Sequence, residues 1–431
     1  VGQMTTQMII AQCLMVLTLI IMITGKTPLY LTAIVGAAVS AIVAGYPIAG
    51  SAPMTVGKMI NMGLNPVIAD MTGILLFIGI MQATGFLDVI VRDIVLVGNK
   101  IGGGPGVCTA GGIAAGLIGA LTGFTQPVIT AVITGPAAVR LGVDPNKAAG
   151  IQAHAGHIGN LAGFTHPTQV AILATAGIGY GLFNVLGLIA ALSIFAMSYV
   201  RVVHDMKKRG VSVTPEERAK IIEEIKAKKY TTTSLRAFTP FLILFIGFII
   251  GLPIFLVGVV AAITAAIMAS SKPKEAEKHM IEGVGLISTP LVATIGFLFM
   301  SAVIKQIGLV GTISGFAAPL LNSVSPVLVM FGVAFCTAFI TQSYAASVAV
   351  LVPFLQVVLA TGADPFASAF AAASGASLIQ YFLTGGPVAA LSTVIPVIPG
   401  SDLKTANAFQ RPSILFGSFV ALLITIALTI I

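Results

Sequence analysis

The stretch GFTQPVITAVITGP, residues 123–136, places a threonine, a glutamine and a proline inside chain that is otherwise apolar. The stretch FITQSYAASVAVLVP, residues 339–353, repeats the Thr-Gln pair and has a proline at nearly the same distance from it. Proline interrupts helices, and a polar group without a partner is costly in apolar surroundings. Because these residues occur twice in matching surroundings, we expect them to have a functional role.

The composition around these stretches is that of a membrane protein. Of the 431 residues, 57% are hydrophobic and 8% are charged, and the mean hydropathy is +1.05. Soluble domains carry about 25% charged residues, and a soluble chain could not cover so much apolar surface. We therefore expect an all-α polytopic membrane protein with lipid as its solvent, and we do not interpret the net charge of +8 as nucleic-acid binding. Four apolar runs approach the roughly 20 residues that cross a bilayer: residues 8–25, 181–200, 240–260 and 414–431.

The chain divides into two halves that resemble each other. Segment 201–236 is the one hydrophilic block and holds ten of the 22 Lys and Arg residues. On either side of it, TAIVGAAVSAIVAG (32–45) matches VGVVAAITAAIMAS (257–270), and GVDP (142–145) matches GADP (362–365). With the Thr-Gln stretches, these matches follow in the same order at a nearly constant offset, which predicts an internal repeat.

The basic residues orient the two repeats. Cytoplasmic loops are enriched in Lys and Arg, so the block 201–236 is placed in the cytoplasm. Counting spans outward from it puts 20 of the 22 basic residues on that side and leaves only Lys58 and Lys305 outside. The halves then have opposite topologies and both termini lie outside. Inverted repeats of this kind are typical of transporters, with the substrate site near the membrane midplane.

The Thr-Gln stretches are predicted to be the tips of two re-entrant hairpins. The first lies between two cytoplasmic loops, so the chain must enter the membrane, turn at residues 125–127 and leave on the same side. The second turns at residues 341–343 and enters from outside. Non-helical backbone at this depth is tolerated only where protein buries it or where it lines a wet cavity. The two tips are therefore expected to meet near the bilayer centre.

Each hairpin is followed by a helix with a break, GFTHPT (163–168) in the first half and QYFLTGGP (380–387) in the second. Breaks present helix N-termini and N–H groups, which attract anions, and free carbonyls, which attract Na⁺. A plain Gly/Pro kink explains a single break equally well. Four irregular points at matching places favour a binding site.

Three histidines are the ionisable candidates in these helices. His154 and His157 lie three residues apart and share a helix face, and His166 lies in the break itself. Each could meet a carboxylate or carry a proton, because imidazole titrates near neutrality. The alternative is a neutral ring in an interhelical hydrogen bond. Two His residues without a neighbouring Cys or carboxylate are an incomplete ligand set, so no metal centre is expected.

Signatures of enzymes are missing from the sequence. The Gly-rich segment GNKIGGGPG (98–106) lacks the Lys-Ser/Thr ending of a phosphate loop, and we interpret it as a hinge before the first hairpin. The segment TPEERAKIIEEIKAKK (214–229) is predicted to be a solvated, charged helix that links the repeats. No enzymatic activity is expected, and no cofactor other than Na⁺ or H⁺ as coupling ion.

The order of span, hairpin, broken helix and span, duplicated upside down, resembles the ion-transporter superfamily of secondary anion carriers. Within it, the sequence is similar to the anaerobic C4-dicarboxylate carrier family. The residues that carry the resemblance are MQATGFLDVI (81–90), the charged central loop, TQSYAASVAVLVP (341–353) and FAAASG (370–375).

The resemblance implies secondary active transport of succinate, fumarate, malate or aspartate, by exchange or by Na⁺ or H⁺ coupling. It also implies a homodimer in the cell (inner) membrane of a bacterium or archaeon. In the elevator mechanism that it implies, a transport domain with both hairpins and broken helices slides past a scaffold.

The expected division of the chain follows from the repeats. The first repeat, 1–200, would contain scaffold helices 8–100, hairpin 105–140, broken helix 145–178 and span 181–203; the linker would be 201–235; and the second repeat, 236–431, would contain scaffold helices 236–322, hairpin 325–361, broken helix 365–397 and span 412–431.

The substrate site is predicted at the tips and breaks. Other organic anions (citrate, lactate, gluconate) or an amino acid on the same scaffold stay open, as do a Na⁺/H⁺ antiporter and a channel or receptor. The antiporter is disfavoured because no Asp or Glu pair lies at depth. The predicted lining residues are Thr125, Gln126, Thr165, His166, Thr168, Thr341, Gln342, Ser343, Tyr344, Thr384 and Gly385, with His154 and His157 as proton or carboxylate partners and Na⁺ candidates near Gly123, Thr125, Thr341 and Gly385.

Overall fold

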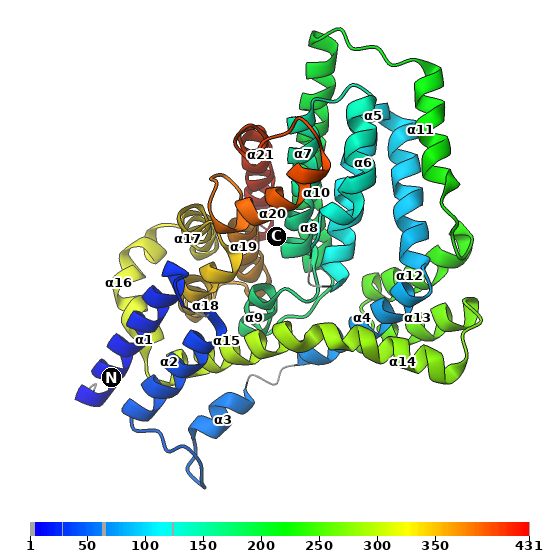
Figure 1. Cartoon of the computed structure of the whole chain (residues 1–431). Coiled ribbons are helices and arrows are strands. Elements are labelled where there is room, and N and C mark those ends of the chain that lie inside the picture. The colour runs from blue at the N-terminus through cyan, green and yellow to red at the C-terminus, as the bar shows by residue number, and fades with distance from the viewer. Residues whose placement is uncertain (1–4, 28, 63–65, 123–124, 431) are drawn as a thin grey trace.

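The computed structural model describes residues 5–27, 29–62, 66–122 and 125–430, and these ranges contain helices and no strand (Figure 1). The first half contains α1 (Thr6–Thr24), α2 (Leu29–Val43), α3 (Val56–Asn61), α4 (Pro66–Ala83), α5 (Phe86–Thr122), α6 (Val128–Arg140), α7 (Pro145–Ala153), α8 (Ala155–Ala162), α9 (Pro167–Ala176) and α10 (Leu182–Lys208). The linker contains α11 (Pro215–Ala227). The second half contains α12 (Ser234–Ile249), α13 (Ile254–Met268), α14 (Pro273–Val284), η1 (Gly285–Ile287), α15 (Ser288–Gln306), α16 (Leu309–Ser323), α17 (Pro326–Thr341), α18 (Tyr344–Ala360), α19 (Pro365–Ser377), α20 (Gly385–Val394), η2 (Ile395–Val397) and α21 (Leu403–Ile430).

Several of these helices are suited to a membrane. Within the described ranges, five are long and apolar enough to cross one, or up to six if the bent pair α16–α17 counts as one span. Their outer faces carry large aliphatic side chains, as on α13, where Leu256 is 57% exposed and Ile267 is 72% exposed. Apolar groups on an outer surface of this extent are stable against lipid tails, so the chain is a polytopic membrane protein.

The two halves follow the same order of elements. Helices α1 and α2 pack against each other, as do α12 and α13. The hairpin of α5 and α6 then corresponds to the hairpin of α17 and α18. Broken helices follow both hairpins, and a long apolar helix, α10 or α21, closes each half. This order is compatible with the predicted repeat, and both the repeat and the inverted relation of the halves stay predictions.

Both predicted tips fall between helices. Helix α5 ends at Thr122 and α6 begins at Val128, while α17 ends at Thr341 and α18 begins at Tyr344. The Gly-rich segment before the first hairpin, interpreted above as a hinge, contains a bend, because Gly103 adopts φ 58° and ψ −131° inside α5. Only glycine adopts such a conformation at low cost.

The broken helices begin at the two matched Asp-Pro pairs. The Asp144 carboxylate accepts bonds from the N–H groups of Asn146 and Lys147 at 3.0 and 3.2 Å, and Asp364 accepts from the Ala367 N–H at 2.7 Å. An Asp at the N-cap followed by Pro at the first helical position is a strong start signal. These carboxylates are therefore structural caps.

Some predicted bounds differ from the structure. The predicted broken helix 145–178 has a second interruption ahead of its break, at His154, which separates α7 from α8. The span 181–203 is α10, which continues to Lys208, so the start of the predicted linker belongs to this helix. The span 412–431 is part of α21, which begins at Leu403.

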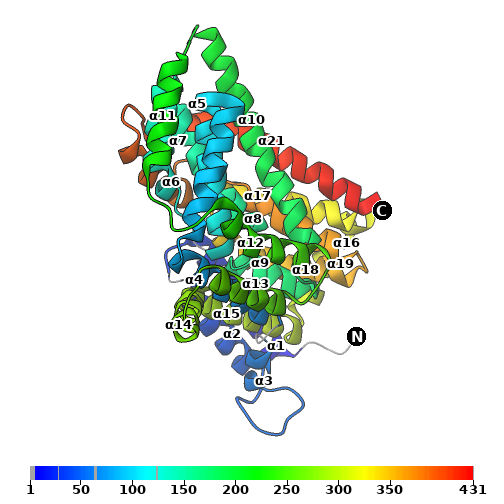
Figure 2. The same ribbon diagram turned by 90° about the vertical axis from the view of Figure 1, so that its right-hand side faces the viewer.

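The linker helix α11 is not fully solvated, which corrects the prediction for residues 214–229. It begins with a capping box formed by Thr214 and Glu217. One face then buries Ile221 and Ile225 in a cluster with residues of α5 and α6. Figures 1 and 2 show α11 beside the first part of α5, between the end of α10 and the start of α12. An i, i+4 apolar pair in a charged segment was the signal for this packing.

Candidate substrate cavity

A cavity of about 730 Å³ lies where the two tips and the two breaks come together. Residues 125–127 of the first tip and residues 343–345 of the second line the same cavity, so the tips face each other across it. Its polar lining residues in the described part of the chain are Thr125, Gln126, His157, Asn160, His166, Ser343, Tyr344, Gln380 and Thr393.

Four helices reach this cavity with their N-terminal ends. Helix α6 does so through Pro127 and Val128, α9 through His166, α18 through Ser343 and Tyr344, and α20 through its second residue. No side chain caps the first N–H groups of α6, α9 or α20, whereas the Ser343 hydroxyl caps α18 by accepting from the Ala346 N–H. Uncapped N–H groups and the positive ends of helix dipoles attract anions.

The cavity walls provide no formal charge of either sign. None of its described lining residues is Asp, Glu, Lys or Arg. The positive potential of the helix ends is therefore not neutralised by a lining carboxylate. This arrangement suits a small anion that accepts several hydrogen bonds.

His166 and Tyr344 line the cavity with polar atoms that are available to bind a ligand. Their rings lie 4.7 Å apart between centroids at an interplanar angle of 31°. The His166 Nδ1 atom and the Tyr344 hydroxyl are both buried, and neither has a hydrogen-bond partner among the described residues. Buried polar groups are rarely left unpaired, so a ligand or water is expected to complete them.

His157 lines the cavity but is already bonded. Its Nε2 atom lies 2.7 Å from the Ile379 carbonyl oxygen, which joins α8 to the second break. His154 does not line the cavity, because its Nε2 atom lies 2.8 Å from the Ser198 hydroxyl on α10. Ser198 in turn donates to Ser413 on α21 at 2.7 Å. Both rings therefore take the interhelical role that the sequence left open.

The carbonyl oxygens of the first break are engaged by side chains. Asn184 Nδ2 and Gln169 Nε2 both donate to the Gly163 carbonyl, at 3.1 and 2.9 Å. The Tyr180 hydroxyl donates to the Phe164 carbonyl. These oxygens are consequently unavailable for a cation unless the side chains move away.

At the second break, amide side chains likewise donate to backbone carbonyl oxygens. Asn160 Nδ2 donates to the Ser377 carbonyl at 3.4 Å, and Asn407 Nδ2 donates to the Gln380 carbonyl at 2.9 Å. In the described ranges, no three His, Cys, Asp or Glu side chains come together as metal ligands. The Gly163, Phe164 and Gln380 carbonyls of the two breaks are thus already engaged by side chains. Of the residues named for Na⁺, Gly123 lies outside the described residues.

Gln342 occupies a different place from the predicted one. It does not line the cavity; it joins the second tip to the second break. Its Oε1 atom accepts from the N–H groups of Tyr381 and Phe382 at 2.9 and 3.2 Å, and its Nε2 atom donates to the Phe339 carbonyl at 2.9 Å. Its backbone has φ 49°, the left-handed conformation that ends α17.

Other predicted lining residues support the cavity from behind or lie away from it. The Thr168 hydroxyl donates to the Tyr344 carbonyl at 3.3 Å, and the Thr341 hydroxyl donates to the Ser343 carbonyl at 3.2 Å. Thr165 is buried away from the cavity. Thr384 is exposed and lies just before Gly385, the first residue of α20.

The first tip is packed tightly on two glycines. A Cβ atom at Gly119 or at Gly159 would collide with the Thr125 hydroxyl. The close approach of three backbone segments fixes Thr125 at the cavity wall. Asn160 and Gln380 were not among the predicted site residues, although an Asn in an apolar helix and a Gln inside the break segment were signals for them.

No protein-family model matches this chain, and no curated protein matches it either. Among solved structures, the fold is similar to that of the YdaH transporter of Alcanivorax borkumensis, with a TM-score of 0.60. The alignment covers 96% of this chain and 97% of that chain at 15% sequence identity. At this identity the likeness is one of fold. The chain thus has the fold of a membrane transporter.

Proposed function

We propose that the protein is a secondary active transporter of small carboxylates, with C4-dicarboxylates such as succinate, fumarate, malate and aspartate as the leading class. The observation that carries this proposal is the meeting of four helix N-termini at one cavity without a charged wall. The transporter fold supports transport as the task of that cavity.

Carboxylate binding would use the uncapped N–H groups of the helices together with two side chains. One carboxylate end would accept from N–H groups at the uncapped starts of α6 and α20. The other would lie beside the pair of His166 and Tyr344, whose unpartnered groups can donate to it. Hydrogen bonds to a charged acceptor are stronger than neutral ones, so a cavity without lysine or arginine can still hold an anion.

Coupling to H⁺ is favoured over coupling to Na⁺. A proton on His166 would offset one carboxylate charge in a cavity that has no other cation. The side chains that occupy the break carbonyls disfavour Na⁺ at those places. An inward proton gradient should therefore stimulate uptake into liposomes, and a Na⁺ gradient alone should not. The reverse result would indicate Na⁺ coupling.

The remaining expectations complete the proposal. The hairpins and broken helices would move as the transport domain of an elevator, in a homodimer in the cell (inner) membrane of a bacterium or archaeon. Both termini would lie outside and α11 in the cytoplasm. The concentration of basic residues around α11 supports this orientation.

Counterflow of labelled acids in proteoliposomes tests the function. Wild-type protein should exchange labelled succinate against a panel of C3 to C6 acids with saturation, and His166→Ala should lower the apparent affinity by about tenfold. His204→Ala, at the exposed end of α10, is the matched control and should behave like the wild type.

Other results of this assay would redirect the proposal. Counterflow of citrate, lactate, gluconate or an amino acid, without any C4 acid, would keep the site and change its substrate. Proton flux driven by Na⁺ alone would indicate an antiporter. Flux without saturation would indicate a channel, and binding without flux would indicate a receptor.

A further inference from the structure

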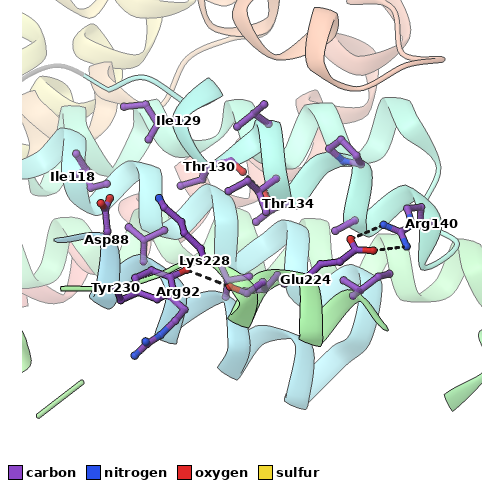
Figure 3. A pocket seen from close by; sticks show the side chains of 18 residues that line it. Asp88, Arg92, Ile118, Ile129, Thr130, Thr134, Arg140, Glu224, Lys228 and Tyr230 are labelled. Carbon is purple, nitrogen blue, oxygen red and sulfur yellow. Dashed lines mark hydrogen bonds and ion pairs between the residues drawn. The ribbon is translucent and has the colours of Figure 1, made fainter. Parts of the chain in front are cut away.

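A second pocket, separate from the substrate cavity, lies between α5, α6 and the linker helix α11 (Figure 3). We call it the linker pocket. Its volume is about 400 Å³, and it shares no lining residue with the substrate cavity. The hairpin helix α6 bounds the pocket on one side and the charged linker bounds it on the other. The pocket therefore has an apolar wall and a charged wall.

The wall from α6 is apolar and continues onto the outer surface. Ile129, Val132 and Ile133 line the linker pocket, and their side chains are 49%, 51% and 50% exposed. In a membrane protein, half-exposed aliphatic groups on a hairpin helix face lipid tails. An acyl chain that lies along α6 could therefore enter the pocket without leaving apolar surroundings.

The opposite rim contains charges that are already paired. Arg140 donates two bonds to the Glu224 carboxylate, at 2.8 and 3.2 Å, and these bonds hold the pKa of Glu224 below its ordinary value. Arg92 pairs with Asp93 at 2.7 Å and lies 4.5 Å above the Tyr230 ring. None of these charges is free for a ligand.

Two charged side chains of opposite sign remain. Among the described residues that line the pocket, Lys228 and Asp88 are the charged ones without an ion-pair partner. Figure 3 shows both at the same end of the pocket, away from the Arg140–Glu224 pair, with Lys228 reaching in from α11. The Lys228 Nζ atom lies 5.9 Å from the centroid of the Tyr230 ring, a cation–π contact. The pocket therefore offers a cation and an anion that are not in ion pairs, beside an apolar wall.

We propose that the linker pocket binds a phospholipid with a phosphoethanolamine headgroup. The lipid phosphate would pair with the Lys228 ammonium, the ethanolamine ammonium would donate to the Asp88 carboxylate, and an acyl chain would lie along Ile129 and Ile133. A phosphoglycerol headgroup ends in a neutral glycerol, whose hydroxyls can donate to the Asp88 carboxylate but cannot balance its charge. A choline headgroup has no N–H with which to bond the carboxylate.

Because of where the pocket lies, a bound lipid would contact two separate parts of the fold. Helix α11 joins α10 to α12, and the pocket lies between α11 and the first hairpin. A lipid that contacts both would fasten the hairpin to the linker. This inference stands on the pocket alone and does not depend on the identity of the transported solute.

Native mass spectrometry of the full-length protein with an equimolar mixture of three lipids tests the proposal. The mixture contains phosphatidylethanolamine, phosphatidylglycerol and phosphatidylcholine with the same acyl chains. Wild-type protein should retain phosphatidylethanolamine about tenfold over the other two. Lys228→Gln should lose that preference, and Lys228→Arg should keep it. Lys226→Gln is the matched control and should not change the preference, because Lys226 is exposed on the last turn of α11, two residues before Lys228, and does not line the pocket.

Asp88→Asn provides the second variant. Removal of the carboxylate leaves Lys228 as the free charge, so retention should shift from phosphatidylethanolamine to phosphatidylglycerol. Equal retention of the three lipids by the wild type would overturn the proposal. So would an equal loss in Lys226→Gln and Lys228→Gln, or binding of soluble phosphoethanolamine as tight as that of the lipid.

Discussion

At the scale of single residues, amide side chains hold the irregular backbone around the cavity. A helix that is broken inside a membrane leaves N–H and C=O groups without helical partners. Here Asn184 and Asn407 donate to carbonyls of the two breaks, and Gln342 accepts from N–H groups of the second. The amide side chains form the hydrogen bonds to backbone groups that water would form in a soluble protein. Each is therefore a positioning residue for the helix ends that face the cavity.

Gln342 allows the sharpest test of this role. Gln342→Ala removes the acceptor of the Tyr381 and Phe382 N–H groups, and each buried donor left without a partner costs about 1–3 kcal/mol. We expect uptake to be lost and the melting temperature in detergent to fall. Gln342→Glu keeps an accepting oxygen at the same place and should retain part of the uptake. The exposed Gln82 offers the control, Gln82→Ala, which should leave both quantities unchanged. If Gln342→Ala took up substrate like the wild type, Gln342 would not be needed to position the helix ends at the cavity.

At the scale of elements, helix starts position the site, and each has a local cause. Asp-Pro begins α7 and α19 through an N-cap carboxylate. The starts of α6, α9 and α20 lack a side-chain cap, and these three open toward the cavity. The capped starts of α7 and α19 thus begin the broken helices, whereas three uncapped starts and the capped start of α18 face the cavity where an anion would bind. The cost of the missing caps is offset when a ligand accepts from the free N–H groups.

The cap of α19 can be tested by two substitutions at Asp364. Its carboxylate accepts from the Ala367 N–H at 2.7 Å. Asp364→Ala removes this bond and should destabilise the protein by about 1 kcal/mol, whereas Asp364→Asn keeps an acceptor and should stay within a few tenths of the wild type. Thermal unfolding in one detergent compares the three proteins. If both variants lose the same stability, the negative charge and not the cap is what matters at this position.

The sequence located these elements better than it located their contacts. Thr-Gln and Gly-Pro segments in apolar chain predicted where the helices end, because those residues act on their own neighbours. The partners of the freed backbone groups come from distant helices, as with His157 on α8 and the Ile379 carbonyl. No local pattern encodes which amide meets which carbonyl. For the same reason Gln342 was predicted at the cavity wall although its side chain turns to the break.

At the scale of the whole molecule, the tips and breaks form one body held by polar bonds. His157, Gln342 and Asn407 each tie a different helix to the second break. Toward α12 the body makes a ring contact, in which Phe164 lies 5.3 Å from Phe248 between centroids. Apolar contacts can slide without losing a specific partner, whereas hydrogen bonds fix one geometry. This difference favours motion of the body as a unit, in which the bond that Gln356 on α18 donates to the Ser301 carbonyl on α15 would have to break.

A cross-link across the boundary tests whether such sliding carries transport. Gln356 on α18 donates through Nε2 to the Ser301 carbonyl on α15 at 3.0 Å, so the two positions are close in the described state. In a variant whose three native cysteines are replaced by Ser, Ser301→Cys with Gln356→Cys should be joined by a short bis-methanethiosulfonate cross-linker, which forms a disulfide bond with each thiol. The expected result is loss of uptake that a reducing agent restores, because α18 would belong to the moving body and α15 to the scaffold. The control pair Ser198→Cys with Ser413→Cys joins α10 to α21, which pack on the broken helices, and its cross-link should leave uptake intact. Full uptake by the cross-linked Ser301–Gln356 pair would exclude sliding at this boundary and leave local opening of the tips as the route to the cavity.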